Sequence, residues 1–542
     1  MLKKLLLLTA LLASFTALPA EDDPHYVKEK ILVVSLSTES LIYNPLESYS
    51  ATEAQLYSAL YEGLVTYHPF TLDPLPGVAR RWEISEDGRT YRFYLRTEAR
   101  YWNGDLVTAG DFRETWLMLL DPRRNAPYSF LLDSVKGARD FRTGLTAEPE
   151  DVGIRAEGDH VFVVELEEPS DPFLKILCHH SFVPLHPRIR DLVEEGSPAP
   201  GLGNGPFFLF ESSGEGMIFR KNELYWDRKN VDLREIRFLF QDDEEKAAEL
   251  FNQGKIHWSM GNIDFNKVEN RGAITLNPLF ATTYYYFTSQ QEPYTDPRVR
   301  QALALLIPWE EIRSEEVYFT PATTLVPPLP GYPAAEPLNS TDEEKAWRLL
   351  EEAGYPGGKG LPPLVLLVPQ GGENSPAVRT LSQSWQEKLE GEVAVRTLPA
   401  RTYYQGLEAE EYTLGTLTWI GDFADPLTFL QMWASDSNLN SGGFESEEYD
   451  ELIRLSGRQT GDTRMKTLAR AEELLLQEAV VLPISHQPAL NVVAASLLEG
   501  WYPNPLDIHP FKYISFYRPE IPPNVVQTAP LRFDLLVIFR YN

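Results

Sequence analysis

The chain of 542 residues contains a single cysteine, Cys178. One cysteine excludes a disulfide within the chain, so the fold has to be stabilised by packing. The composition allows large cores, because 43% of the residues are hydrophobic and 12% are aromatic. At about 150 residues per domain, the length predicts three to four domains.

Long hydrophobic runs are also missing. Beyond the first twenty residues, no stretch approaches the roughly 18 uninterrupted apolar residues of a membrane span. The first twenty residues have the layout of a secretory signal peptide: Lys3-Lys4, an apolar run from Leu5 to Leu12, and small residues at Ala17 and Ala20. They contain no cysteine for lipid attachment. We therefore expect cleavage near Ala20 and a soluble periplasmic protein without membrane insertion.

Basic residues are scarce. The chain has 49 Lys and Arg against 79 Asp and Glu, which gives a formal net charge of -30. Nucleic acid and anionic lipid both need a positive patch on the protein that binds them, so neither is an expected partner. The excess carboxylate can attract cationic ligands, but its ordinary role is solubility, and we favour that explanation.

Catalytic and cofactor motifs are absent as well. The sequence has no phosphate loop, zincin or nucleophile-elbow motif, and the glycines of 201–205 lack the third member of a dinucleotide-binding loop. Cys178, His179, His180 and His186 do not have the spacing of a standard zinc site. Adjacent histidines on a strand would also point to opposite sides. We therefore expect no cofactor, no metal site and no catalytic residue, so the protein is not expected to be an enzyme.

A β-hairpin is predicted over residues 81–96. Its strands show the period-2 alternation of half-buried strands on either side of Asp87-Gly88, a dipeptide that favours a tight turn. The alternating residues are Trp82, Ile84, Tyr91, Phe93 and Leu95.

A capped helix is predicted directly after this hairpin. Thr108 offers a hydroxyl cap and Asp111 a carboxylate three residues later. Further strands are predicted at 31–34, 162–166, 236–238, 364–368, 393–395 and 412–418, and further helices around Leu56, at 244–252, after Ser340 with Glu343, and around Trp385. Alternation of this kind indicates layered α/β lobes.

The ordered motifs of the chain resemble a known family. They include Tyr61-Glu62-Gly63-Leu64, Trp102-Asn103-Gly104-Asp105, Gly203-Asn204-Gly205-Pro206, Asn222-Glu223-Leu224-Tyr225-Trp226 and Asp296-Pro297-Arg298-Val299-Arg300-Gln301-Ala302-Leu303. The string is similar to the oligopeptide- and dipeptide-binding proteins of bacterial ABC importers, which belong to family 5 of the bacterial extracellular solute-binding proteins. The resemblance covers about residues 31–517. One departure is Pro308-Trp309, where relatives usually have an Asp-Arg pair.

The resemblance implies an α/β, three-lobed fold of the periplasmic binding protein type (class II), with mixed sheets, flanking helices and a hinge between lobes I and III. Lobe I would comprise residues 21–56, 184–281 and 501–542, lobe II residues 57–183, and lobe III residues 282–500. The tail 519–542 has no family counterpart that we can identify, and its apolar run 535–539 could add a strand to a sheet edge or form a packed extension.

The resemblance also implies a ligand site at Trp419-Ile420-Gly421-Asp422. In relatives, a Trp-x-x-Asp sequence at this place presents a carboxylate that holds the α-ammonium group of the ligand. The alternative for Asp422 is a turn residue that caps backbone amides. Because Trp419 and Gly421 also match, we favour the ligand role.

Relatives bind the peptide main chain by strand addition. The matching segments here are Tyr49-Ser50-Ala51 and the strand ending at Trp419. The run Tyr284-Tyr285-Tyr286 corresponds to a tyrosine-rich strand of the cleft. Since strand side chains alternate, we expect Tyr284 and Tyr286 to face the ligand and Tyr285 to lie in the core.

The anchors for the carboxylate of the ligand do not carry over. Thr416 stands where oligopeptide-binding relatives have a basic residue, and Ser485-His486-Gln487 replaces a tyrosine-rich segment. Thr416 and His486 are candidate ligand contacts, although a surface or core role is as good an interpretation of His486. Ligand length and the way its carboxylate is held stay open.

The resemblance implies a monomer that captures short peptides in an interlobe cleft and delivers them to a membrane ABC permease. Two alternatives remain. One is a binding protein for a non-peptide ligand such as a metal chelate, and the other is an exported peptide hydrolase or chaperone.

Overall fold

The structure is a computed structural model that describes residues 24–37, 44–48, 50–146, 148–194, 201–314, 319–335, 340–399, 403–407 and 411–517. The expected signal peptide, Tyr49 and the tail 519–542 lie outside these residues. No helix within the described ranges has both the length and the apolar character needed to cross a bilayer.

The helices and strands alternate along much of the chain. The helices are α1 (Pro24–Glu29), α2 (Ala51–Leu60), α3 (Ala109–Leu120), α4 (Ala138–Arg142), α5 (Phe173–Ile176), α6 (Pro187–Glu194), α7 (Glu244–Asn252), α8 (Pro297–Leu305), α9 (Trp309–Ser314), α10 (Glu343–Glu352), α11 (Pro376–Lys388), α12 (Tyr403–Gly406), α13 (Leu427–Leu430), α14 (Glu447–Ser456) and α15 (Gly461–Gln477). The strands are β1 (Ile31–Leu36), β2 (Val65–Tyr67), β3 (Pro74–Pro76), β4 (Ala79–Ile84), β5 (Thr90–Leu95), β6 (Ile154–Ala156), β7 (Val161–Glu165), β8 (Phe207–Ser213), β9 (Gly216–Lys221), β10 (Glu235–Phe240), β11 (Trp258–Ser259), β12 (Ile274–Phe287), β13 (Thr320–Pro321), β14 (Leu364–Pro369), β15 (Val393–Leu398), β16 (Leu414–Ile420), β17 (Val481–Val493), β18 (Leu498–Glu499) and β19 (Ser515–Phe516).

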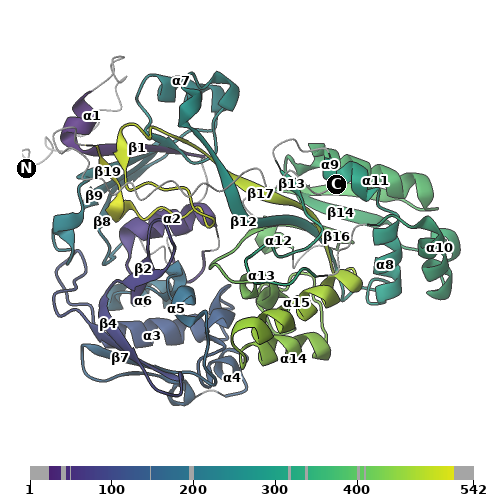
Figure 1. Cartoon of the computed structure of the whole chain (residues 1–542), viewed down its shortest axis with the longest axis horizontal. Coiled ribbons are helices and arrows are strands. Elements are labelled where there is room, and N and C mark those ends of the chain that lie inside the picture. Colours follow the sequence, from purple (N-terminus) through teal and green to yellow (C-terminus); the bar gives the residue numbers. More distant parts are fainter. Residues whose placement is uncertain are drawn as a thin grey trace, which may run out of the picture.

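One sheet of eleven strands runs through most of the molecule. Its order is β15-β14-β16-β12-β17-β11-β1-β10-β9-β8, with β13 added beside β17. The pairs β1/β10, β1/β11 and β14/β15 are parallel, whereas β12 pairs antiparallel with both β16 and β17. The long strands β12 and β17 connect the purple and blue part of the molecule with the green part (Figure 1). The predicted α/β fold with mixed sheets is confirmed.

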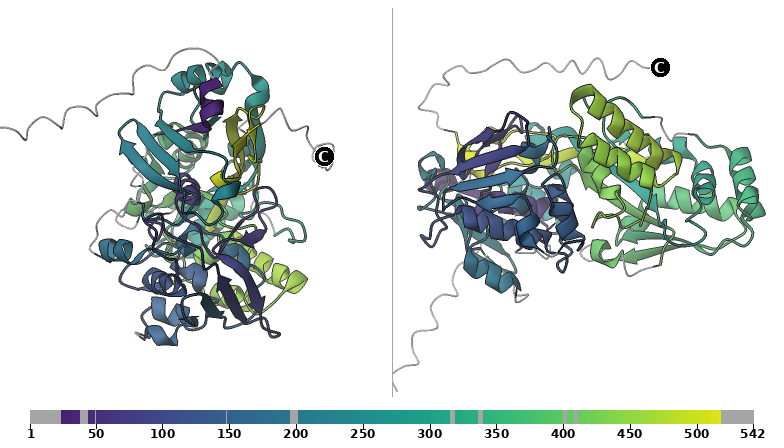
Figure 2. Two further views of the ribbon diagram at one scale, coloured as in Figure 1. Left: turned by 90° about the vertical axis from the view of Figure 1, so that its left-hand side faces the viewer. Right: turned by 90° about the horizontal axis from the view of Figure 1, so that it is seen from below.

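The crossing between the two parts is marked by proline. Pro278 of β12 lies opposite Pro488 of β17, and the register shifts before the next pair, Thr282 with His486. Proline has no backbone N–H, so neither residue can donate a ladder hydrogen bond here. This is where we expect the hinge between lobes I and III. Seen from below, the parts on either side of this crossing lie side by side (Figure 2).

A second, four-stranded sheet has the order β4-β5-β7-β6 and lies within the range expected for lobe II. The predicted hairpin is confirmed as β4 and β5, and Gly88 in its turn has a φ of 71°. The predicted cap is also confirmed, because Thr108 and Asp111 form a reciprocal capping box at the start of α3. Helix α3 covers this sheet through Phe112 and Trp116, both fully buried.

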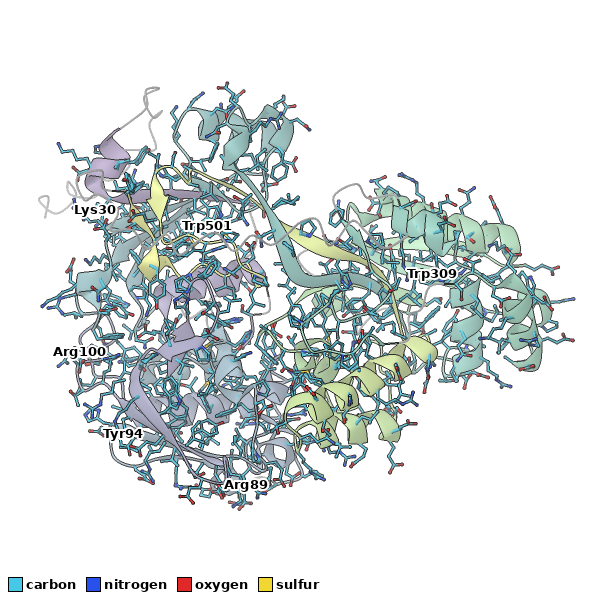
Figure 3. The ribbon with its side chains drawn as sticks, viewed as in Figure 1. Lys30, Arg89, Tyr94, Arg100, Trp309 and Trp501 are labelled. Carbon is cyan, nitrogen blue, oxygen red and sulfur yellow. The ribbon has the colours of Figure 1, made fainter. Side chains whose placement is uncertain are left out.

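One prediction about lobe III is wrong, and one departure from the family pattern is accommodated. The N-cap of α10 is Asp342, whose carboxylate accepts a hydrogen bond from the Lys345 backbone at 2.9 Å. The prediction of Ser340 as the cap is therefore wrong by two residues, because the helix begins at Glu343 and its N-cap is the residue directly before that position. The Pro308-Trp309 departure leaves the fold intact. Trp309 is buried within lobe III, where its ring nitrogen donates to the Ala304 carbonyl at 3.0 Å (Figure 3).

The family motifs converge on one buried carboxylate, that of Glu62. The Asn204 side chain accepts from the Glu62 backbone N–H at 3.0 Å and donates to the Glu62 carbonyl at 2.8 Å. The carboxylate itself accepts from Lys512 at 2.8 Å, and from Tyr225 and Trp226. Motifs that are far apart in the sequence thus meet at Glu62, and Lys512 supplies the positive charge that pairs with its carboxylate. The network connects an early, a middle and a late segment of the chain.

Removal of the cation from this network should be costly. Lys512→Ala leaves the Glu62 carboxylate buried without its charged partner, and we expect a loss of about 3–5 kcal/mol in the free energy of unfolding. The matched control is Lys246→Ala, which breaks a solvent-exposed pair with Glu249 and should lower the free energy of unfolding far less. Urea denaturation of both variants checks this, and equal losses would contradict the structural role of Lys512.

Candidate functional site

The predicted anchor, Asp422, lies just after β16 and is almost enclosed, with 8% of its side chain exposed. The Thr428 hydroxyl donates to the Asp422 carboxylate at 3.1 Å and accepts from the Asp422 backbone N–H at 2.9 Å. The Tyr67 hydroxyl donates to the Asp422 carbonyl oxygen at 2.9 Å. Tyr67 belongs to β2, in the range expected for lobe II. This hydrogen bond therefore connects that range with Asp422 in lobe III.

The flanking motif residues hold this turn in place. The Trp419 ring nitrogen donates to the Thr428 carbonyl at 3.1 Å, and the Gly421 N–H donates to the Phe280 carbonyl at 2.8 Å. A Cβ at Gly421 would lie 2.6 Å from the Phe280 ring and 2.9 Å from the Thr428 methyl group. Trp419 and Gly421 therefore have a clear structural role in the position of Asp422, and direct contact with a ligand stays a prediction for both.

The opposite wall of the site is aromatic and neutral. His179, just before a 3-10 turn (His180–Phe182), places its Nε2 at 3.6 Å from the Asp422 carboxylate. Its ring lies 4.3 Å from that of Tyr128, and Tyr128 lies 6.5 Å from Trp419. Burial, together with the neighbouring His180, holds the pKa of His179 well below its ordinary value. The imidazole is therefore uncharged at neutral pH.

Asp422 consequently lacks a cation. Burial raises the pKa of its carboxyl group to about 7, although hydrogen bonds from Thr428 and Tyr128 oppose the shift. Among the described residues, no lysine or arginine forms an ion pair with it. Asp425, three residues later, is different, because Arg464 binds its carboxylate through two hydrogen bonds of 2.7 and 2.8 Å. Asp425 is therefore neutralised by a side chain of the protein itself, whereas Asp422 has no cationic partner among the described residues.

The tyrosines of β12 do not fit their predicted orientation. Tyr284 and Tyr286 are fully buried, with the Tyr284 hydroxyl 3.7 Å from the Met432 sulfur and the Tyr286 hydroxyl 3.3 Å from that of Tyr412. Both rings pack against Trp433 in the core of lobe III. Alternation correctly separates them from Tyr285, but both faces of this strand are packed. Their contact with a ligand is a prediction that the geometry does not favour.

The remaining predicted contacts are spread over several elements. The Thr416 hydroxyl donates to the Tyr284 carbonyl at 3.1 Å, and His486 Nδ1 lies 2.9 Å from the Thr282 hydroxyl. Burial lowers the pKa of His486 to about 4, so it is neutral. Ala51 is the exposed first residue of α2, and Ser50 caps that helix, so the pairing of Ala51 with a peptide main chain stays a prediction. Tyr49 lies outside the described residues.

Four contacts of Asp422 were not anticipated from the sequence, namely Tyr67, Tyr128, His179 and Thr428. The two adjacent histidines had been considered only as metal ligands, and the prediction that they point apart is wrong. Their rings lie 4.0 Å apart, because they sit where α5 gives way to a 3-10 turn and not on a strand. Within the described part of the chain, no three His, Cys, Asp or Glu side chains are grouped to hold a metal ion.

Residues from two separate parts of the chain thus meet at Asp422. Residues 73–441 match the family model described as bacterial extracellular solute-binding proteins, family 5 Middle. The chain belongs to this family of solute-binding proteins.

Named relatives extend over nearly the same length. The dipeptide-binding protein DppE of Bacillus subtilis is 25% identical over 478 residues, which are 84% of this chain and 86% of the relative. The periplasmic oligopeptide-binding protein OppA of Salmonella typhimurium is 27% identical over 520 residues, 91% of this chain and 93% of the relative. The murein tripeptide binding protein MppA of Escherichia coli has a structure with a TM-score of 0.80 at 26% identity, over 90% of this chain and 99% of its own.

The raised pKa of Asp422 predicts how closure of the ligand-free protein depends on pH. In this structure, which we call the closed form because residues of two lobes meet at Asp422, burial raises the pKa of the carboxyl group to about 7, whereas an exposed aspartate has a pKa near 3.8. The closed form therefore binds the proton more tightly, and its stability relative to the open form should fall as pH rises from about 4 to about 7 and then level off.

Small-angle X-ray scattering of the ligand-free protein measures this equilibrium. We expect a larger radius of gyration at pH 8.5 than at pH 5, and Asp422→Asn should remove the difference. A pH dependence that survives in Asp422→Asn, or closure that improves with rising pH, would contradict the assignment.

Proposed function

We propose that this chain is an extracytoplasmic solute-binding protein that captures short peptides between its lobes and delivers them to a membrane ABC permease. The observation that carries the proposal is the buried Asp422 carboxylate without a cation. The α-ammonium group at the start of a peptide is a primary cation of the right charge, and it would replace the missing partner. The relatives named as dipeptide-, oligopeptide- and murein tripeptide-binding proteins support a peptide over a metal chelate.

The main chain of the peptide has a place to pair. Strand β16 is paired with β12 along its whole length, but β14 reaches it only at Leu414. The stretch from Leu417 to Ile420 therefore has a free edge on its second side among the described strands, next to Asp422. An extended peptide can add to such an edge through main-chain hydrogen bonds, which are independent of its sequence.

Closure completes the site. Tyr67, Tyr128 and His179 reach Asp422 from the range expected for lobe II, so these contacts are lost when the lobes separate. A peptide ammonium ion that pairs with Asp422 removes the cost of burying the carboxylate and thereby favours the closed form. The prolines at the crossing of β12 and β17 supply the hinge for this motion.

The far end of the peptide is held differently from its amino end. His486 is neutral, so it can donate or accept a hydrogen bond but cannot neutralise a carboxylate. Thr416 offers only a hydroxyl group, which already donates to a backbone carbonyl. We therefore propose that amino-end recognition dominates the affinity and that ligands of several lengths are accepted. Export to the periplasm and a monomeric state belong to the same proposal.

The role of Asp422 can be tested with trialanine and N-acetyl-trialanine as ligands. Asp422→Asn removes the charge that pairs with the α-ammonium group, and breaking such a buried pair costs about 3–5 kcal/mol, so trialanine should bind at least about a hundredfold more weakly. The acetylated peptide, which lacks the ammonium group, should bind weakly to both proteins. Isothermal titration calorimetry measures all four combinations.

The matched control is Glu150→Gln, which removes a carboxylate that is 75% exposed and should leave trialanine binding unchanged. Native mass spectrometry of the purified protein then identifies any co-purified ligand. Equal trialanine affinity in wild type and Asp422→Asn, or a bound metal chelate, would contradict the proposal.

A further inference from the structure

A second set of contacts joins the lobes away from Asp422. Arg139 and Arg142 lie on α4, in the range expected for lobe II, and Asp436 lies in the lobe III loop that follows Gln431–Trp433. Arg139 Nε is 2.6 Å from the Asp436 carboxylate, and Arg142 Nη2 is 3.3 Å from it. Arg142 Nη1 also donates to the Asp436 backbone carbonyl at 2.7 Å. We call Arg139, Arg142 and Asp436 the latch.

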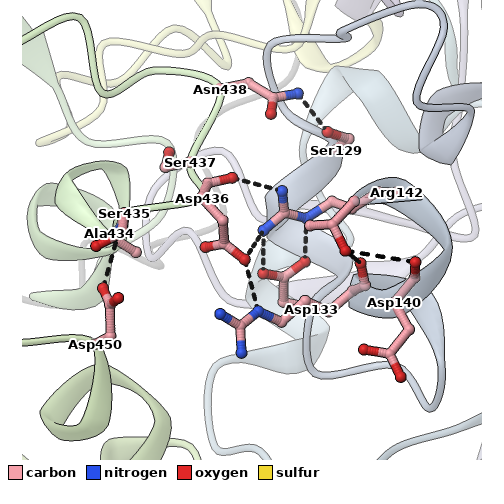
Figure 4. A network of polar contacts seen from close by, with 12 residues as sticks. Ser129, Asp133, Asp140, Arg142, Ala434, Ser435, Asp436, Ser437, Asn438 and Asp450 are labelled. Carbon is pink, nitrogen blue, oxygen red and sulfur yellow. Dashed lines mark hydrogen bonds and ion pairs between the residues drawn. The ribbon is translucent and has the colours of Figure 1, made fainter. Parts of the chain in front are cut away.

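The lobe II half of the latch is fixed before the lobes meet. Arg142 donates to both carboxylate oxygens of Asp133, each at 2.6 Å, and only 3% of its side chain is exposed (Figure 4). Both residues belong to the same lobe, so this pair does not depend on closure. It holds the guanidinium group in the orientation that Asp436 needs, which lowers the entropic cost of the interlobe contact.

Asp436 completes the arrangement from the other side. Its partial burial opposes ionisation, but Arg139 and Arg142 together hold its pKa below the ordinary value, so it is charged in the closed form. The neighbouring Asn438 donates to the Ala126 carbonyl at 2.8 Å and lies 2.9 Å from the Ser129 hydroxyl. One short loop of lobe III is thus held at several points.

A cavity beside the latch explains why polar contacts are important at this edge of the interface between the lobes. A cavity of about 280 Å³ lies between the lobes here, and the latch residues form part of its wall. Where such a space remains, apolar packing between the lobes is incomplete. The charged contacts therefore bridge the lobes at this edge.

We infer that Asp436 and Arg139 are positioning residues that set the balance between the open and closed forms, and so the ligand affinity, without touching the ligand. Only the consequence for affinity rests on the proposed function. The closed form is selected through contacts that exist without any ligand, and the apparent dissociation constant scales inversely with the fraction of closed, binding-competent protein.

The test uses two variants, one on each lobe, because Arg142→Ala would also break the pair with Asp133. Asp436→Ala and Arg139→Ala are partly exposed positions, at 25% and 40% of the side chain, and should fold. The matched control is Glu83→Gln, which breaks an exposed ion pair with Arg81 inside one lobe. Circular dichroism and the thermal midpoint should be unchanged in all three.

Small-angle scattering of ligand-free protein at pH 5 gives the primary readout, because Asp422 is protonated in the closed form there. We expect a larger radius of gyration for Asp436→Ala and for Arg139→Ala than for wild type and Glu83→Gln. The double variant should open no further than Asp436→Ala alone, because that substitution already removes the carboxylate that both arginines contact. Trialanine should bind each variant at least about tenfold more weakly.

Equal radii in wild type and both latch variants would overturn the inference, and so would additive opening in the double variant. Failure of the wild type to bind trialanine would count against the proposed function alone, since the scattering comparison needs no ligand.

Discussion

A carboxylate that is buried between two lobes without a cation is the constraint on which the arrangement depends. Asp422 is held by Thr428, Tyr67 and the turn of Trp419 and Gly421, and it faces a neutral histidine. In the closed, ligand-free form this group is either protonated or an uncompensated charge, and both states are unfavourable near neutral pH. Under the proposed function, the primary ammonium group of a peptide relieves that cost, so that closure and recognition become one event.

Two other buried acids are each paired with a cation, whereas Glu472 is satisfied by the Val326 N–H and the Tyr332 hydroxyl. Glu62 has Lys512, Tyr225 and Trp226, and Asp425 has Arg464. These pairs are complete whether or not a ligand is present. Between the lobes, the latch adds a third kind of contact, which is complete only on closure and involves no ligand. Under the proposed function, the ligand affinity would therefore depend on the hinge, the latch and Asp422, which lie in different places.

Those parts of the fold that depend on residues close together in the sequence could be predicted from it. The hairpin around Asp87-Gly88 and the capping box of Thr108 with Asp111 follow from residues a few positions apart, and the structure contains both. The Trp419 to Asp422 motif predicted the anchor through resemblance, and the structure shows that its carboxylate is buried beside residues of the range expected for lobe II. The same resemblance named the motifs around Glu62, but their convergence on one carboxylate is a tertiary fact that no single motif encodes.

The failures have a common physical cause. Alternation along β12 separates Tyr285 from its neighbours, but it cannot tell whether a strand face meets a ligand or a packed core, and Trp433 fills the space beside Tyr284 and Tyr286. His179 was misjudged because its local conformation is a turn and not a strand, and its contact with Asp422 spans more than 240 positions of sequence. Contacts between residues so far apart in the sequence depend on how the lobes pack against each other. The periodicity of hydrophobic residues carries no information about that packing.

The most direct measurement is a crystal structure of the protein in complex with trialanine. The account predicts the peptide nitrogen within about 2.7–3.2 Å of the Asp422 carboxylate, in a closed form with the peptide paired along the free edge of β16. A peptide bound elsewhere, or bound with its amino end away from position 422, would contradict it.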